Sequence, residues 1–250
     1  DHSDVMACRQ TGFAMLCSSD VQEVMDLGAV AHLSAIAGKV PVMHFFDGFR
    51  TSHEQQKISV WDYDELRSMV DWDAVKRFRE NALNPNHPHS MGSAEQPETF
   101  FQHREACNKN YDDTVEIIAK YMDMVSEKTG KTPHYKPFNY YGAEDAEEVI
   151  VAMGSVCDAI EEAIDYANAN GKKTGLVVVR LYRPFSRKYF LEALPDTVKK
   201  IAVLDRTKEP GSMGEPLLLD VTAAIKDSEF NDVLVTGLER YTATGSAGSL

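Results

Sequence analysis

The clearest structural pattern of the chain lies in residues 11–46, which read TGFAMLCSSDVQEVMDLGAVAHLSAIAGKVPVMHFF. The apolar run at residues 11–17 predicts a buried strand, and the residues before it are expected to form a loop that enters this strand. Within residues 21–36 the apolar side chains recur at helical spacing. A second apolar run at residues 40–46 predicts another buried strand. A strand, a helix and a strand with short connections form a βαβ unit, so we expect a parallel sheet here.

Local signals support the limits of the predicted helix. Residues 18–20 offer N-caps, and Gln22 or Glu23 can close a capping box with them. Gly38 is expected to end the helix, because glycine is common just after the last helical turn.

The second predicted strand is followed by a polar loop with several chemically active side chains, Asp47, Arg50, Thr51, Ser52 and His53. In open α/β sheets, ligands bind beyond the carboxyl ends of the strands, so this position favours a functional role. Ser52, His53 and Asp47 could be written as a hydrolytic triad. We reject that interpretation, because no GxSxG turn accompanies them.

The rest of the chain predicts further helices and a second α/β unit. Residues 62–79 and 99–128 are expected to be helical, with a long ordered loop at residues 84–92, and a boundary follows at residues 129–137. The first part therefore shows only two clear strands and resembles half of a domain. After the boundary we expect strands at residues 148–153, 175–181, 200–205 and 232–236, and helices at residues 158–168, 186–194 and 216–225.

Composition excludes several classes of protein. The 250 residues include 26 lysines and arginines against 39 aspartates and glutamates, giving a formal net charge of −13. This charge argues against a nucleic-acid scaffold and against attraction to an anionic membrane. No apolar run approaches the roughly 20 residues of a membrane helix, and no signal peptide is recognised. We expect a globular protein of a reducing compartment.

Metal-binding patterns are weak. The four cysteines form no CxxC pair, so a zinc or iron–sulfur site built within this chain is not expected. His87, His89 and His103 cluster in sequence, but Pro88 separates the first two and no third ligand stands at a regular spacing. We therefore predict no metal site.

Three polar segments leave alternatives open. The turn at residues 154–157 follows a strand and opens a helix, so its amides could bind an anion, although a plain connecting turn is the commoner case. The loop at residues 205–211 carries mixed charges that could pair internally or contact a ligand. Arg9 precedes a strand and could grip a carboxylate with two parallel hydrogen bonds, or form a surface salt bridge.

The chain resembles the pyruvate:ferredoxin (flavodoxin) oxidoreductases from residue 1 to about residue 236. The resemblance departs afterwards, where the family continues with a second glycine and Arg-Tyr-Gly but this chain reads LERYTA from Leu238. The matching motifs are DHSDVMACRQTGF at residues 1–13, HFFDGFRTSHE at residues 44–54, AVKRFR at residues 74–79 followed by ALNP and HPH, VRLYRPF at residues 179–185, and VLDRTKEPG at residues 203–211.

The resemblance implies an α/β fold in two parts. Residues 1–135 would form the later, incomplete part of a parallel-sheet domain that binds the pyrimidine of thiamine diphosphate. Residues 136–236 would form most of a domain similar to the C-terminal domain of transketolase. Residues 237–250 are expected to be a divergent or linker-like tail. Both ends suggest a piece of something longer.

The resemblance also implies an activity for the full-length enzyme. Such enzymes oxidatively decarboxylate pyruvate with coenzyme A to acetyl-coenzyme A and CO₂, and pass electrons to ferredoxin or flavodoxin in anaerobic metabolism. They use thiamine diphosphate, Mg²⁺ and [4Fe–4S] clusters, and the expected form is a cytoplasmic homodimer. This part alone is expected to bind no cofactor and to be inactive. The alternatives are another 2-oxoacid as substrate, or a non-catalytic module for domain contacts.

By the same resemblance, Arg9 matches the family arginine that binds the carboxylate of pyruvate. The motif that contains Asp47, Arg50 and residues 51–53 (Thr51, Ser52, His53) is expected near the rim of the active site or at a domain contact, with no role assigned to a single side chain.

Overall fold

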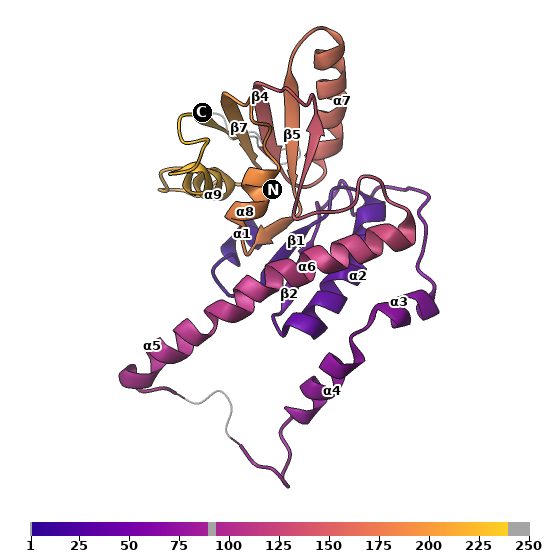
Figure 1. The fold of residues 1–250 in the computed structure, drawn as a ribbon, viewed down its shortest axis with the longest axis vertical. Helices are drawn as coiled ribbons and strands as arrows, with labels where there is room; N and C mark the ends of the chain where they lie inside the picture. Colours follow the sequence, from indigo (N-terminus) through magenta and orange to yellow (C-terminus); the bar gives the residue numbers. More distant parts are fainter. Residues whose placement is uncertain (1, 90–93, 240–250) are drawn as a thin grey trace.

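Two β-sheets organise the chain in the computed structural model, which describes residues 2–89 and 94–239 (Figure 1). The first sheet has the order β2-β1-β6 and the second the order β3-β5-β4-β7-β8. The predicted α/β class is therefore confirmed. The first sheet contains β1 (Ala14–Cys17), β2 (Val42–Phe45) and β6 (Leu181–Arg183), and the second contains β3 (Phe138–Gly142), β4 (Glu148–Ala152), β5 (Thr174–Val179), β7 (Lys200–Asp205) and β8 (Leu234–Glu239).

The predicted βαβ unit is present at the start of the chain. β1 pairs with β2 in parallel, with Ala14 opposite Val42, and α2 (Val21–Gly38) connects the two strands. The Oδ1 atom of Asp20 accepts a hydrogen bond from the amide of Glu23 at 2.8 Å and thereby caps the helix. The helix continues through Gly38, and Lys39 ends it in the left-handed region at φ 57°.

The helical segments differ from the prediction in three places. The expected loop at the start contains a short helix, α1 (Ser3–Ala7), whose Met6 is buried. The segment predicted as one helix from residue 62 forms α3 (Tyr63–Met69) and α4 (Trp72–Glu80), because Asp71 caps a new helix by accepting the amide of Ala74 at 2.8 Å. The segment expected at residues 99–128 divides at Cys107 into α5 (Pro97–Ala106) and α6 (Asn108–Thr129).

The strands of the second unit also differ. The run predicted as one strand from Gly175 to Leu181 divides at Arg180 into β5 and β6, and β6 leaves its sheet to pair antiparallel with β1. The unpredicted strand β3 pairs antiparallel with β5 at the edge of the second sheet. Residues 237–239 belong to β8 rather than to a tail, and the rest of the predicted tail lies outside the described residues. Residues 90–92, the last part of the predicted loop, also lie outside them.

The hydrophobic core runs through both sheets. Ala14 and Leu16 face α2 and α6, whereas Met15 and Cys17 face the other way and pack with side chains of the second sheet. Alternate residues of a strand point to opposite faces, so β1 is buried on both. The predicted boundary near residue 135 therefore does not interrupt the core, and it stays a prediction as a domain boundary.

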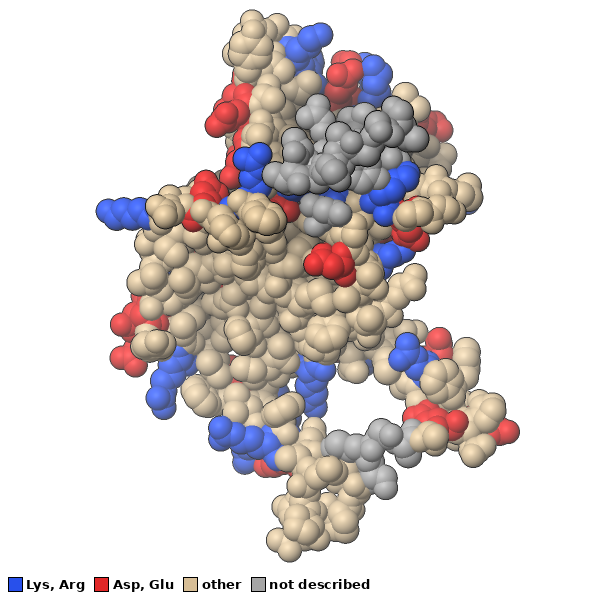
Figure 2. Space-filling model, turned by 180° about the vertical axis from the view of Figure 1, so that it is seen from behind, with Lys and Arg blue, Asp and Glu red and all other residues tan. Residues whose placement is uncertain are grey.

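Helices cover the second sheet on both faces, with α7 (Val156–Ala169) on one side and α8 (Arg187–Glu192) and α9 (Pro216–Ile225) on the other (Figure 1). In contrast, α4 and α5 extend away from both sheets as an arm. Seen from behind, the centre of the molecule carries few charged side chains, and these gather toward its periphery (Figure 2). None of the described helices has the length and apolar character needed to cross a membrane.

Candidate functional site

Arg9 follows α1 and precedes β1, and its guanidinium forms two hydrogen bonds within the chain. Its NH1 group donates to the carbonyl of Met6 at 2.9 Å, and its NH2 group donates to Oε2 of Glu209 at 2.6 Å. The Arg9 side chain is 19% exposed and that of Glu209 is 38% exposed. A guanidinium has five N–H donors, so most of its donor capacity remains available for a further acceptor. The structure thus pairs Arg9 with a carboxylate without closing the guanidinium to solvent.

The loop at residues 205–211 runs beside the start of the chain and brings Glu209 to Arg9. The amide of His2 donates to the carbonyl of Arg206 at 2.8 Å, and the hydroxyl of Thr207 donates to that of Ser3 at 3.2 Å. The charged side chains of this loop, whose role the sequence left open, therefore form internal contacts, and the pair of Glu209 with Arg9 joins residues 200 positions apart.

Two buried carboxylates, those of Asp205 and Glu215, form hydrogen bonds that anchor this loop. Glu215 is 2% exposed and accepts the amide of Glu209 at 2.6 Å and the ammonium of Lys208 at 2.7 Å. Asp205 accepts the amides of Leu217 and Leu218 at the start of α9. Desolvation by burial raises the pKa of Asp205 to about 6, although these two hydrogen bonds oppose the shift.

Asp47 lies at the centre of a second cluster, just beyond β2. Its carboxylate is buried and lies 2.6 Å from Nε2 of His2, accepts the amide of Ser155 at 2.6 Å, and pairs with Arg206. Burial alone would raise the pKa of Asp47, but hydrogen bonds from His2 and Ser155 outweigh it and hold that pKa well below its ordinary value. Asp47 is therefore a contact between the two sequence halves.

The turn before α7 does bind an anion, and the anion is the Asp47 carboxylate. Gly154 has φ +79°, and a Cβ atom there would lie 2.7 Å from Oδ2 of Asp47. Only glycine combines this conformation with such a close approach. The amide of Ser155 then points at the carboxylate, as expected at the N-terminus of a helix.

The remaining residues of the predicted motif point in different directions. Thr51 is buried, and its hydroxyl donates to the carbonyl of Ser19 at 3.1 Å. Arg50, Ser52 and His53 are exposed. The Oγ atom of Ser52 accepts the amide of Phe49 and lies 2.7 Å from Nδ1 of His53. The structure thus places Asp47 and Thr51 in internal contacts and leaves the other three predicted residues at the surface.

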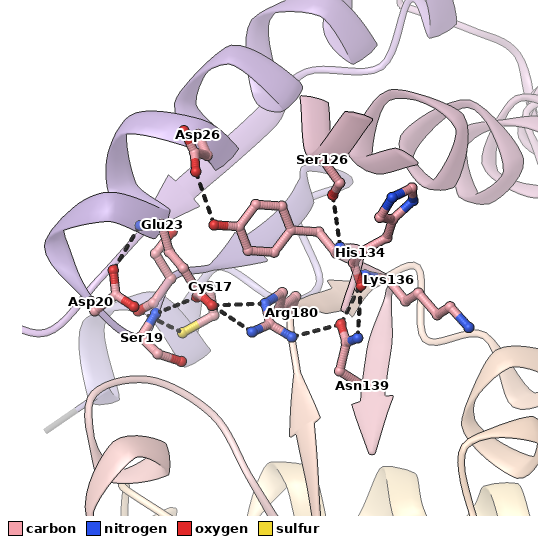
Figure 3. A network of polar contacts seen from close by, with 12 residues as sticks. Cys17, Ser19, Asp20, Glu23, Asp26, Ser126, His134, Lys136, Asn139 and Arg180 are labelled. Atoms are coloured by element: carbon pink, nitrogen blue, oxygen red, sulfur yellow. Dashed lines mark hydrogen bonds and ion pairs between the residues drawn. The ribbon is translucent and has the colours of Figure 1, made fainter. Parts of the chain in front are cut away.

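A third cluster, which the sequence did not predict, joins β1 and α2 to the second unit (Figure 3). Arg180 lies between β5 and β6, and its Nε–H and one of its NH2 groups both donate to Oε1 of Glu23, the former at 3.2 Å. Its NH1 group donates to Oδ1 of Asn139 at 2.7 Å. The other carboxylate oxygen of Glu23 accepts the amide of Ser19 at 2.9 Å, and this contact supplements the predicted capping of α2.

Opposite charges compensate one another in this cluster, which is buried. The side chains of Arg180 and Glu23 are 9% and 3% exposed. Burial would raise the pKa of Glu23, but the charge and hydrogen bonds of Arg180 lower it below its ordinary value. Nearby, the hydroxyl of Tyr135 donates to Asp26 at 2.9 Å, and the Tyr135 ring lies beneath the Arg180 guanidinium. The carboxyl ends of β1 and β2 are therefore occupied by internal contacts.

Among residues 2–89 and 94–239, no group of three histidine, cysteine or acidic side chains is placed to hold a metal ion. All four cysteines are free, and burial raises the pKa of Cys17 and of Cys157. Nδ1 of His103 lies 2.9 Å from Oε1 of Glu95. The donors present do not fit an iron–sulfur cluster or a Mg²⁺ site built from this part of the chain alone.

A large open hollow lies away from the predicted site residues. Its volume is about 1020 Å³, and it lies beside the edge strand β3, with Tyr140 and Tyr141 of that strand and Tyr189 of α8 in its lining. Neither Arg9 nor Asp47 lines it.

Known protein families match both parts of the chain. Residues 1–123 match a family model described as pyruvate flavodoxin/ferredoxin oxidoreductase, thiamine diphosphate-binding, and residues 146–242 match pyruvate:ferredoxin oxidoreductase core domain II. The chain is 56% identical over 237 residues to pyruvate:ferredoxin oxidoreductase of Moorella thermoacetica, covering 95% of this chain and 20% of the relative. It is 55% identical over 245 residues to pyruvate-flavodoxin oxidoreductase of Enterobacter agglomerans, covering 98% and 20%.

A solved structure supports the fold. The 2-oxoglutarate:ferredoxin oxidoreductase of Magnetococcus marinus, with 2-oxoglutarate, coenzyme A and succinyl-CoA bound, matches with a TM-score of 0.56 and 16% identity, over 95% of this chain and 42% of that chain. The chain spans about one fifth of the length of the relatives that it matches by sequence.

Proposed function

We propose that this chain, which belongs to the pyruvate:ferredoxin (flavodoxin) oxidoreductase family, takes part in the oxidative decarboxylation of pyruvate with coenzyme A to acetyl-coenzyme A and CO₂. Electrons would pass to ferredoxin or flavodoxin, the acceptors for which the relatives are named. The support is an identity above half over nearly the whole chain. The activity is that of a full-length enzyme that contains this segment, because the segment spans only a fifth of each of these relatives.

The role we propose for this segment is to bind the substrate carboxylate through Arg9. The observation that carries it is a guanidinium that is mostly buried, anchored by Met6 and Glu209, and still has unused N–H donors. A planar guanidinium can grip a carboxylate with two parallel hydrogen bonds, and partial burial strengthens such a contact. Pyruvate is small, so its carboxylate is the group that a cation can recognise best.

Cofactors belong to the full-length enzyme in this proposal. Thiamine diphosphate is in the description of the matching family model, and its chemistry would be to accept the electron pair left when CO₂ departs. Mg²⁺ and [4Fe–4S] clusters would be held elsewhere, since the described residues provide no fitting ligand set. We also propose that the enzyme is a cytoplasmic homodimer.

The test is the Arg9→Ala substitution in a full-length enzyme that carries this segment. Truncating one partner of a partly buried charge pair costs about 3 kcal/mol, so the pyruvate KM should rise about 100-fold. Arg183→Ala is the matched control, because Arg183 is 22% exposed and pairs with Asp220 at 2.9 Å. Unchanged KM and kcat in Arg9→Ala would remove the assignment.

A further inference from the structure

Glu209 is the charged partner of Arg9 in the described part of the chain. Its carboxylate meets the NH2 group of Arg9 at 2.6 Å, although the two residues lie 200 positions apart. The carbonyl of Met6 holds the NH1 group at 2.9 Å. Two acceptors on two different nitrogens fix both the position and the plane of a guanidinium, and they leave its other N–H groups pointing elsewhere.

The loop that carries Glu209 is held in place on both sides. On the side of the chain start, the carbonyl of Arg206 and the hydroxyl of Thr207 form hydrogen bonds with residues 2 and 3. On the other side, buried Glu215 accepts the backbone amide of Glu209 itself. The carboxylate therefore sits on an anchored segment of backbone. Such a partner orients a cation at low entropic cost, because little freedom is left to lose.

We infer that Glu209 is a positioning residue for substrate binding: it orients the Arg9 guanidinium so that the free N–H groups face the carboxylate of the 2-oxoacid. The inference rests on the proposed role of Arg9. It has a clear rival, in which the Glu209 carboxylate occupies the place of the substrate carboxylate and competes with it. The anchored backbone of Glu209 favours positioning, since a competing carboxylate must move aside when substrate binds.

The two roles predict opposite effects of removing the carboxylate. If Glu209 positions Arg9, then Glu209→Ala loses an oriented guanidinium, and the pyruvate KM should rise about tenfold, the effect of one charge-assisted hydrogen bond. If Glu209 competes with substrate, the same variant should bind pyruvate more tightly and its KM should fall. In the positioning case kcat should change less than twofold, because Glu209 does not touch the reacting carbon.

The experiment uses a full-length enzyme that carries this segment and measures the pyruvate KM, kcat and the inhibition constant of oxamate, an unreactive anion shaped like pyruvate. Glu209→Gln keeps the shape and one acceptor oxygen, so its KM should lie between those of the wild type and Glu209→Ala. Asp220→Ala is the matched control, because it removes the partner of Arg183 at 2.9 Å and should leave the KM unchanged.

Three results decide the matter. A raised pyruvate KM and a raised inhibition constant of oxamate in Glu209→Ala support positioning, provided that adding Glu209→Ala to Arg9→Ala raises neither constant further. An unchanged or lowered KM in Glu209→Ala, with a raised KM in Arg9→Ala, overturns the role of Glu209 and leaves the proposed function standing. An unchanged KM in Arg9→Ala itself refutes the proposed substrate contact.

Discussion

Replacing Arg180 by methionine tests the buried ion pair that joins α2 to the second unit. The guanidinium makes three hydrogen bonds in this cluster, two to Glu23 and one to Asn139. Methionine keeps much of the side-chain volume but removes the charge. The Glu23 carboxylate, 3% exposed, then loses its only charged hydrogen-bond partner among the described residues.

The magnitude follows from the burial of both groups. Removing one partner of a buried pair costs about 3–5 kcal/mol, because the other charge stays in the interior without compensation. We therefore expect the free energy of unfolding to fall by about 3–5 kcal/mol. The double variant Arg180→Met with Glu23→Gln should recover part of this loss, because the amide carries no charge.

The assay is urea unfolding of the purified chain, followed by circular dichroism. Lys200→Met is the control, because it breaks an ion pair with Glu148 at 2.9 Å in which both side chains are more than half exposed. Such a pair contributes about 0–1 kcal/mol. A loss in Arg180→Met no larger than in Lys200→Met would refute the reasoning.

The contribution of this ion pair to the free energy of unfolding should depend on pH in a definite direction. The Glu23 pKa is lowered in the folded chain, so its pair with Arg180 stabilises the fold above the unfolded pKa of about 4.3, and the effect is lost as the pH falls through the folded pKa. In Arg180→Met the lone buried carboxylate should have a raised pKa. Its cost should then lessen, rather than grow, as the pH falls.

Three further predictions concern the fold. Asp47→Asn should lower the free energy of unfolding by about 3 kcal/mol at pH 7 and by less at pH 2–3, because the stabilisation that comes from the lowered pKa of Asp47 is lost as the pH falls toward that pKa. Melting temperatures measured across this pH range would show the difference, and an equal loss at both ends would contradict the prediction. Gly154→Ala should lower the free energy of unfolding more than Gly171→Ala in a urea titration. Both glycines have positive φ, but of the two only Gly154 would bring a Cβ atom to 2.7 Å from a carboxylate oxygen. Equal losses would disprove the contact. The purified chain should associate in light scattering, because β2 pairs only with β1 within the described sheet and leaves an edge open; a clean monomer at all concentrations would count against it.

The start of the fold could be predicted because its signals are local. Apolar periodicity and the capping pattern of Asp20 and Glu23 indicated β1, α2 and β2 within a few residues of their observed limits. The missed strand β3 has no such signal. It follows Pro137 and is an edge strand with half-buried tyrosines, so neither alternation nor a continuous apolar run marks it.

The candidate site was harder to predict because its contacts join distant positions. Arg180 stands within an apolar run that suggested one strand, and its partner Glu23 lies 157 residues earlier. The only sequence signal was the charge itself, since an arginine inside a predicted buried strand needs a counter-ion. The pairs Asp47–Arg206 and Arg9–Glu209 likewise depend on the chain bringing residues 205–211 back to its start.

The central claim is that Arg9 recognises a negative charge on the substrate, and comparing an anionic analogue of pyruvate (oxamate) with a neutral one (pyruvamide) tests it most directly. In a full-length enzyme that carries this segment, inhibition by oxamate and by pyruvamide would be measured for the wild type and for Arg9→Ala. We predict that the variant loses about 100-fold in affinity for oxamate but less than threefold for pyruvamide, because only the anion forms the charged contact. Equal losses for both ligands, or none for oxamate, would contradict the claim.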